Sequence, residues 1–220
     1  MIGLFQNVGE SFKFGFSQCY ANGFKGFLRM LALLALCLIP IINFIPFGIF
    51  MKVFRGEKPD FTNAGDSFIR GLLFFVVGIL YMLVPGILFV ITFGISYLPL
   101  DALGDAGEIL LGLLLVIFFL AAIVSAVFLF LIAIPAQINF ARNGFAAAFK
   151  FSEILGMISR AGVAKYLLSY LILLVIMVAA AVVLGLLIGF VPVVGIIVAI
   201  FVAIPLLLFE YRFWANRFEP

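Results

Sequence analysis

Four long apolar stretches dominate the hydropathy pattern of the chain: 71–96, 109–138, 166–190 and 191–209. A helix rises about 1.5 Å per residue, and the hydrocarbon core of a bilayer is about 30 Å thick. About 20 apolar residues therefore suffice to cross it, and each stretch predicts a membrane-spanning helix. The last two stretches meet at the proline- and glycine-containing segment 190–195, which has no charged residue and predicts a tight hairpin turn.

The apolar region 27–54 follows a different pattern. Pro40 and Pro46 interrupt it, with Asn43 between them. Two prolines six residues apart prevent one continuous straight helix. Two structures remain, namely one kinked span or a re-entrant hairpin that enters and leaves the membrane on the same face.

The placement of charge favours the re-entrant hairpin. If 27–54 returns to its own side and the four other stretches cross, all 13 basic residues lie on one side of the membrane. The other side then carries only Asp101, Asp105 and Glu108. This arrangement obeys the positive-inside rule and predicts that both termini are cytoplasmic.

Three amphipathic segments lie between the apolar stretches, at 4–27, 61–70 and 145–160. Each carries aromatic and aliphatic residues at three- and four-residue spacing on one face and polar or charged residues on another. This pattern is typical of helices that lie in the membrane interface.

Composition supports a membrane protein. Of 220 residues, 67% are hydrophobic and only 10% are charged, whereas a soluble domain has about 45–50% apolar and about 25% charged residues. We therefore expect an all-α polytopic membrane protein that forms a single integral membrane domain over 1–220. It should have four spanning helices, a proline-broken re-entrant hairpin and three amphipathic interfacial helices. The predicted location is the cytoplasmic membrane.

The chain also contains a candidate threefold internal repeat. An Ile-Pro pair stands near the end of three apolar runs, at Pro46, Pro135 and Pro205, and a basic residue follows six or seven positions after each proline. The repeat units would cover about 1–56, 57–144 and 145–220. A chance recurrence of Ile-Pro in an isoleucine-rich chain is the alternative.

The sequence offers little reactive chemistry. It has no histidine, and its two cysteines, Cys19 and Cys37, are far apart. Histidine is the commonest metal ligand and general base. We therefore expect no catalytic site, no cofactor, no metal centre and no nucleic-acid partner.

Two sets of residues remain as candidates for binding or packing. Uncharged polar residues inside apolar stretches would line a small cavity or stabilise a turn, or they would bond to neighbouring helices or to their own backbone. They are Asn43, Tyr81, Ser125, Gln137 and Tyr170. Small residues four apart permit close helix packing, within one molecule or between two. They are Ala181, Gly185 and Gly189.

Several short motifs resemble those of a family of uncharacterised archaeal and bacterial membrane proteins, a domain-of-unknown-function family common in methanogens. The matching residues are Ile45-Pro46-Phe47-Gly48, Lys52, Arg55-Gly56, Pro59-Asp60-Phe61, Asp66 to Gly71, Leu80-Tyr81, Pro85, Arg142, Ala148 to Phe151, Glu153-Ile154-Leu155, Ile158 and Tyr166-Leu167. The chain is also distantly similar to the membrane domain of some glycerophosphodiester phosphodiesterases. The resemblance supports the topology and implies no known activity.

Two functions fit these observations. The first is a non-enzymatic accessory or membrane-organising protein, which acts through membrane lipids and a protein partner or a second copy of itself. The alternative is a permease or binder for lipids or other apolar small molecules.

Overall fold

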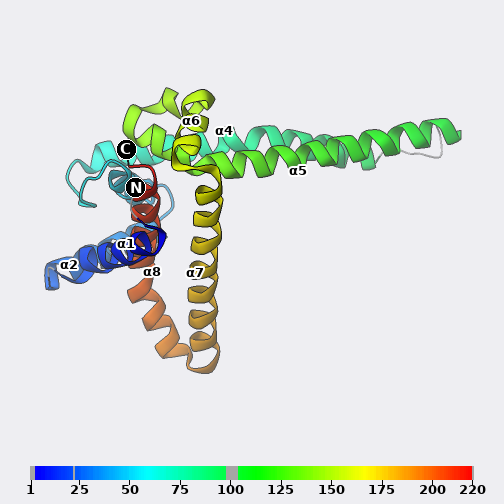
Figure 1. Ribbon diagram of the computed structural model, residues 1–220. Helices are drawn as coiled ribbons and strands as arrows, with labels where there is room; N and C mark the ends of the chain where they lie inside the picture. The colour runs from blue at the N-terminus through cyan, green and yellow to red at the C-terminus, as the bar shows by residue number, and fades with distance from the viewer. Residues whose placement is uncertain (1–2, 22, 98–103, 220) are drawn as a thin grey trace. The chain divides into compact units, whose positions relative to one another are not determined.

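The structure, a computed structural model, describes residues 3–21, 23–97 and 104–219. These residues form α-helices and one 3₁₀ helix, and there is no strand among them (Figure 1). The α-helices are α1 (Leu4–Tyr20), α2 (Phe24–Leu38), α3 (Phe44–Phe54), α4 (Ala64–Ser96), α5 (Gly104–Asn143), α6 (Phe151–Ala161), α7 (Val163–Phe190) and α8 (Pro192–Arg217), and the 3₁₀ helix is η2 (Phe145–Phe149). The prediction of an all-α protein is confirmed.

Four of these helices are long and apolar enough to cross a membrane, namely α4, α5, α7 and α8, with 33, 40, 28 and 26 residues. They contain the four apolar stretches of the sequence. The predicted separate helix over 61–70 differs from the structure, because α4 begins at Ala64 and continues without a break into the span. The reason is that Gly71 alone does not end a helix.

The first amphipathic segment also differs from its prediction. One helix was expected over 4–27, but α1 ends at Tyr20 and α2 begins at Phe24, with Gly23 at a φ of +57°. The angle of the bend between α1 and α2 is 99°. If the bent pair is counted as one span, its length and composition make it a fifth candidate membrane span. Glycine adopts this positive φ without steric cost, which allows the sharp change in direction.

The region 27–54 forms the predicted proline-broken pair of helices. Pro40 and Ile41, the latter at a φ of +72°, separate α2 from α3. Helix α3 has 11 residues and is therefore about 16 Å long, too short to cross the hydrocarbon core alone. This length is compatible with a re-entrant hairpin, and the side on which the hairpin leaves the membrane stays a prediction.

The chain packs as two units. Unit 1 comprises residues 1–74 and 135–220, and unit 2 comprises residues 75–134. The domain prediction, one membrane domain with three repeat units, stays a prediction.

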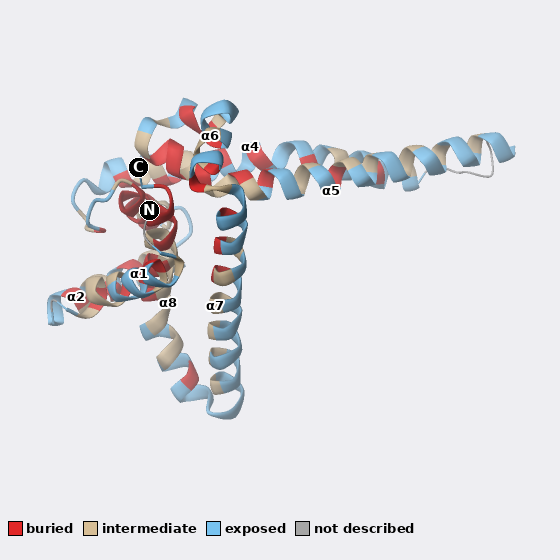
Figure 2. Cartoon of the chain, in the orientation of Figure 1, coloured by how far each residue is buried: buried red, intermediate tan, exposed pale blue. Residues whose placement is uncertain are grey.

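The core of unit 1 lies where α1, α2 and α3 pack on the second half of α8 (Figure 2). In α3, Pro46 and all residues from Gly48 to Phe54 are buried. Aromatic side chains fill this region, and Phe54 and Tyr211 lie with ring centroids 4.8 Å apart. By contrast, only 6% of the residues in the most apolar part of α7 are buried.

Helices α7 and α8 form the predicted hairpin. The turn lies at Val191, and Pro192 is the first residue of α8, where its missing N–H costs no helical hydrogen bond. A Cβ atom on Gly195 would lie 2.4 Å from the backbone nitrogen of Ile188, so a glycine permits this close approach. The turn prediction from 190–195 is therefore confirmed.

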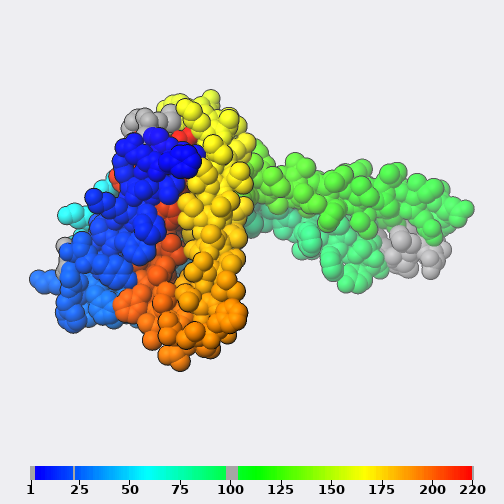
Figure 3. All heavy atoms as spheres, turned by 60° about the horizontal axis from the view of Figure 1, so that its bottom comes forward, coloured from blue at the N-terminus to red at the C-terminus, as the bar shows by residue number. Residues whose placement is uncertain are grey.

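The third amphipathic segment lies close to its prediction over 145–160. Helix η2 is followed by α6, which buries Ile154, Ile158 and Ala161 and exposes its charged residues. In unit 2, the two helical stretches 75–96 and 104–134 lie side by side (Figures 1 and 3). Most of their apolar side chains are exposed, as expected of surfaces that face lipid.

Candidate functional site

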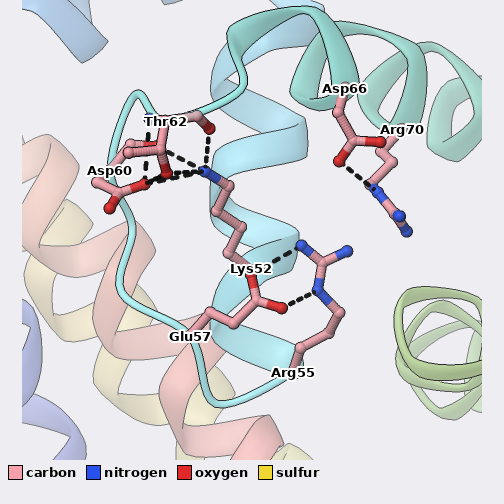
Figure 4. Close-up of polar contacts among 7 residues, drawn as sticks. All are labelled: Lys52, Arg55, Glu57, Asp60, Thr62, Asp66 and Arg70. Carbon is pink, nitrogen blue, oxygen red and sulfur yellow. Dashed lines mark hydrogen bonds and ion pairs between the residues drawn. The ribbon is translucent and has the colours of Figure 1, made fainter.

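The loop after α3 is held by a buried lysine (Figure 4). Lys52 is 5% exposed, and its ammonium lies 3.0 Å from both the backbone oxygen and Oδ1 of Asp60 and 2.6 Å from the backbone oxygen of Thr62. Because an ammonium has three protons, these acceptors use its full donor capacity. Lys52 therefore positions the loop and is not available to a ligand.

Asp60 completes this cluster. Its Oδ1 accepts hydrogen bonds from the backbone N–H and the hydroxyl of Thr62 as well as from Lys52. The hydrogen bond from the Thr62 side chain, followed by those from Lys52 and the charge of that lysine, lowers the pKa of Asp60 below its ordinary value. Arg55 with Glu57, and Arg70 with Asp66, form more exposed ion pairs nearby.

A buried polar network joins the first and last helices. The side-chain amide of Asn7 donates to the backbone oxygen of Phe213 at 3.0 Å, and its Oδ1 accepts from Ser11 and Asn216 at 3.1 and 2.9 Å. Asn7, Ser11 and Asn216 are each at most 5% exposed. Gly15 continues this face, since a Cβ there would lie 2.3 Å from the backbone oxygen of Pro205.

Arg142, at the end of α5, ties three chain segments together. Its Nε donates to the backbone oxygen of Phe54 at 2.9 Å, and its Nη1 donates to that of Phe218 at 2.7 Å. The carbonyls at a helix C-terminus lack helical partners, so a guanidinium that donates to them satisfies groups that would otherwise be unpaired.

A partly open cavity of about 780 Å³ lies beside Arg142 at the ends of α5, α6 and α8, within unit 1. It is large enough for the headgroup region of a lipid, since small-molecule sites measure about 300–1,000 Å³. Its lining residues are Asn139, Arg142, Asn143, Ser152, Glu153, Gly156, Met157, Arg160, Ala161, Arg217, Phe218 and Glu219. We call it the arginine cavity.

Arg217 is the most deeply buried arginine of this cavity. Its side chain is almost fully enclosed, with the residue 5% exposed, and its Nη2 donates to the backbone oxygen of Ala161 at 3.1 Å. Its Nε is buried and has no hydrogen-bond partner. An unsatisfied buried donor of a charged group is costly.

The two carboxylates of the lining are already engaged. Glu153 accepts from Lys150 at 2.9 Å and from Asn139 at 3.2 Å. These hydrogen bonds, that of Lys150 first, lower the pKa of Glu153 and keep it ionised. Glu219 lies 3.6 Å from Arg212.

A second, smaller cavity of about 290 Å³ lies near the start of the chain. It is lined by Ser17, Gln18, Ala21, Arg29, Lys58 and Asp60. No group of three or more cysteine and carboxylate side chains that could hold a metal occurs in the part of the chain that the structure describes.

The five polar residues predicted to line a cavity or a turn do not share one site. Neither cavity described above is lined by any of them. Asn43 lies in the turn before α3, and its Oδ1 is buried without a hydrogen-bond partner. In unit 1, half-buried Gln137 lies in α5, and Tyr170 packs on Trp214 with ring centroids 4.6 Å apart.

The other two predicted polar residues belong to unit 2. Ser125 donates to the backbone oxygen of Ala122 at 2.9 Å, and so it bonds to the backbone of its own helix. Tyr81 is 5% exposed in α4. The role of these residues in ligand binding stays a prediction.

The small residues and the repeat prolines also have clear positions. Ala181, Gly185 and Gly189 are exposed, and a Cβ on either glycine would meet no atom within 4 Å. Pro46, Pro135 and Pro205 are buried, with Pro46 in the first turn of α3 and the other two inside α5 and α8. The threefold repeat stays a prediction. Asp101, which is predicted to lie on the side opposite the basic residues, is outside the described residues.

Sequence reasoning missed the arginine cavity. From the sequence, Arg142, Arg160 and Arg217 indicate membrane orientation because they flank apolar stretches, and nothing in it places them at one site. Arg142 and Arg160 are 18 positions apart, and Arg217 lies a further 57 positions along the chain, so no local motif joins all three. Only the folding of α5, α6 and α8 onto each other brings them to one cavity.

Comparison with known proteins places the chain in a family. An uncharacterized protein of Methanocaldococcus jannaschii, MJ1189, is 32% identical over 148 residues, which are 62% of this chain and 46% of that protein. The chain thus matches less than half the length of this relative. No solved structure matches the chain. The family described as "Protein of unknown function (DUF4013)" matches residues 31–189, most of the chain, and the protein therefore belongs to the DUF4013 family.

Proposed function

We propose that the protein is a non-enzymatic accessory protein of the cytoplasmic membrane, which organises other membrane components through helix–helix contacts. Its partner is another membrane protein or a second copy of this chain, within a lipid environment and without nucleic acid. The distant likeness to the membrane domain of glycerophosphodiester phosphodiesterases does not extend this proposal to phosphodiesterase activity.

The exposed small-residue face of α7 carries this proposal. Ala181, Gly185 and Gly189 are four residues apart, so they lie on one side of the helix. Small residues permit the close backbone approach on which helix association in lipid depends. Within unit 1, a Cβ on Gly185 or Gly189 would meet no atom within 4 Å, and Figure 3 shows α7 uncovered along its length on the face in view. This face supports docking of a partner helix.

The first test is native mass spectrometry of the protein extracted gently from its own membrane. We expect a stoichiometric protein companion, which can be a second copy. Recovery of single copies without a companion would contradict the accessory function.

Variants connect the companion to the proposed face. Replacing Gly185 and Gly189 together by leucine should remove the companion, because two bulky side chains prevent close approach. Ala179→Leu is the matched control, since Ala179 is also exposed on α7 but lies two positions from Ala181 and on a different face. Equal loss of the companion in the control would argue against this face.

The proposed orientation places both termini in the cytoplasm. The basic ends of the spans support it, and labelling with a membrane-impermeant maleimide tests it in a background with Cys19 and Cys37 replaced by serine. Glu108→Cys should be labelled from outside, and Lys58→Cys should not. Labelling of Asn43→Cys from the outside only would exclude the same-side hairpin.

A second candidate function, binding of lipids, has a specific observation in its favour. The arginine cavity offers three guanidinium groups together with Asn139, Asn143 and Ser152, at the shared end of several long helices. A lipid binder should retain a defined lipid without a protein companion, so the mass spectrum described above separates the two functions.

A further inference from the structure

The arginine cavity has an excess of cationic groups. Three arginines line it against two glutamates. The glutamates are paired in turn with Lys150 and Arg212, at 2.9 and 3.6 Å. The positive charge of Arg142, Arg160 and Arg217 is therefore not cancelled within the cavity, and an anion entering it meets a favourable field.

The arginines differ in what they can offer to a ligand. Arg142 uses Nε and Nη1 for backbone carbonyls. Arg217 uses Nη2 for Ala161, while its buried Nε has no partner. Arg160 is exposed at the rim. Arginine donates to phosphate oxygens with a planar set of N–H groups, and Asn and Ser side chains of the lining can add further donors.

From this arrangement we propose that the arginine cavity binds a phosphate group, with the guanidinium groups of Arg160 and Arg217 as its principal donors. This site is separate from the α7 face of the proposed function, because Ala181, Gly185 and Gly189 do not line it.

The position of the cavity favours the phosphodiester of a membrane lipid. The cavity lies at the end of the α7–α8 hairpin where α7 begins and α8 ends, opposite the apolar turn at Val191. Such helix ends lie at the level of the lipid headgroups. Met157, Ala161 and Phe218 add apolar contacts to the lining, which suit the glycerol and upper acyl portions of a lipid.

The test uses the full chain in detergent, titrated with phosphatidylglycerol and, in parallel, with zwitterionic phosphatidylcholine. Native mass spectrometry measures the bound lipid. We expect one tightly bound phosphatidylglycerol and at least about fivefold weaker binding of phosphatidylcholine, whose choline cation is repelled by the arginines. Equal binding of both lipids would overturn the proposal.

Two variants locate the site. Arg160→Gln removes an exposed guanidinium and should weaken phosphatidylglycerol binding by about fivefold or more without loss of folding. Arg70→Gln is the matched control, because Arg70 is another partly exposed arginine of unit 1 that does not line the cavity. Equal weakening in both variants would indicate general attraction to anionic lipid and overturn the site.

Arg217→Lys tests the guanidinium of Arg217. It keeps the positive charge but replaces the planar guanidinium by an ammonium, so binding should weaken although the net charge is unchanged. Circular dichroism and thermal unfolding check that the variant is folded, and Arg160→Gln tests the phosphate site if it is not. A folded Arg217→Lys protein with unchanged affinity would exclude the Arg217 guanidinium as a donor.

Competition identifies the source of the phosphate. Inorganic phosphate and glycerol phosphate are added to the protein with bound phosphatidylglycerol. Retention of the lipid at millimolar competitor supports a lipid headgroup site. Displacement of the lipid by either competitor from the unsubstituted protein, but not from Arg160→Gln, supports a site for soluble phosphate compounds. Failure of phosphatidylglycerol and of both soluble phosphates to bind would overturn the phosphate site and leave the companion test of the α7 face unaffected.

Discussion

The Nε of Arg142 donates a hydrogen bond of 2.9 Å to the backbone oxygen of Phe54, 88 positions earlier in the chain. This contact joins the last turn of α5 to the C-terminal end of α3, the short helix at the centre of unit 1. The same guanidinium reaches the backbone oxygen of Phe218 after α8. The Arg142 side chain thus connects the C-terminal ends of α3, α5 and α8, and it also lines the arginine cavity.

Replacing Arg142 by glutamine should destabilise the protein. The shorter amide cannot reach both carbonyls, and hydrogen bonds from charged groups contribute about 1.5–3 kcal/mol each. We expect a fall in the midpoint of thermal unfolding in detergent of about 4–8 °C. Arg70→Gln, which breaks a partly exposed ion pair with Asp66, should change it by less than about 2 °C. Equal shifts would show that Arg142 has no special role in packing.

Gly48→Ala should disturb the crossing of α3 and α4. A Cβ at this position would lie 1.8 Å from the backbone oxygen of Ser67, so the two helices would have to move apart. Such overpacking costs about 1–3 kcal/mol. The thermal midpoint of this variant should therefore fall. Gly9→Ala is the control, because a Cβ there meets no atom within 4 Å and alanine favours a helix. Two variants that are equally stable would contradict the close crossing.

Acid should weaken the loop that Lys52 and Asp60 hold. The pKa of Asp60 in the folded protein lies below its ordinary value of 3.8, mainly because of the Thr62 hydrogen bond. The ionised carboxylate therefore stabilises the folded state above about pH 4, and this contribution is lost as the pH falls through the lowered pKa. Thermal unfolding from pH 6 to pH 2 should show a larger loss in the native protein than in Asp60→Asn. Parallel pH profiles would rule out this contribution.

Asn7 and Asn216 should be energetically coupled. The amide of Asn216 donates to Oδ1 of Asn7 at 2.9 Å in a buried network between α1 and α8. Each single alanine variant leaves a buried polar partner, whereas the double variant removes both groups. The double variant should thus lose less stability than the sum of the two single losses, by about 1 kcal/mol. Strict additivity in the double-mutant cycle would show that the network does not couple the two helices.

Much of the helical framework could be predicted from the sequence. The spans that became α4, α5, α7 and α8 are long apolar runs, and the turn at Val191 has a proline beside it. The helix boundaries differ from the prediction in two places. Helix α4 continues through the predicted helix 61–70, and a positive φ at Gly23 divides the predicted helix 4–27. A helix end depends on the conformation of one or two residues, which hydropathy does not report.

Packing faces were harder to predict than helices. The sequence predicts an aromatic face of α1 that faces lipid, and Phe5 is 84% exposed. It does not predict that Asn7, Ser11 and Gly15 face α8. These small and polar residues pack there because α8 offers them hydrogen-bond partners and a close backbone. The sequence of α1 does not contain that information, since the partners are about 200 positions away.

The sequence by itself determined that the protein is helical, which segments can span a membrane and where basic residues flank them. These properties follow from local hydropathy and from prolines and glycines, which act over a few residues. Only the tertiary structure decided that Lys52 is buried, that Arg142 bonds to Phe54, and that Arg160 and Arg217 line one cavity. Each of these depends on contacts between distant segments, because a side chain acquires its burial and its hydrogen-bond partners only when the helices pack together.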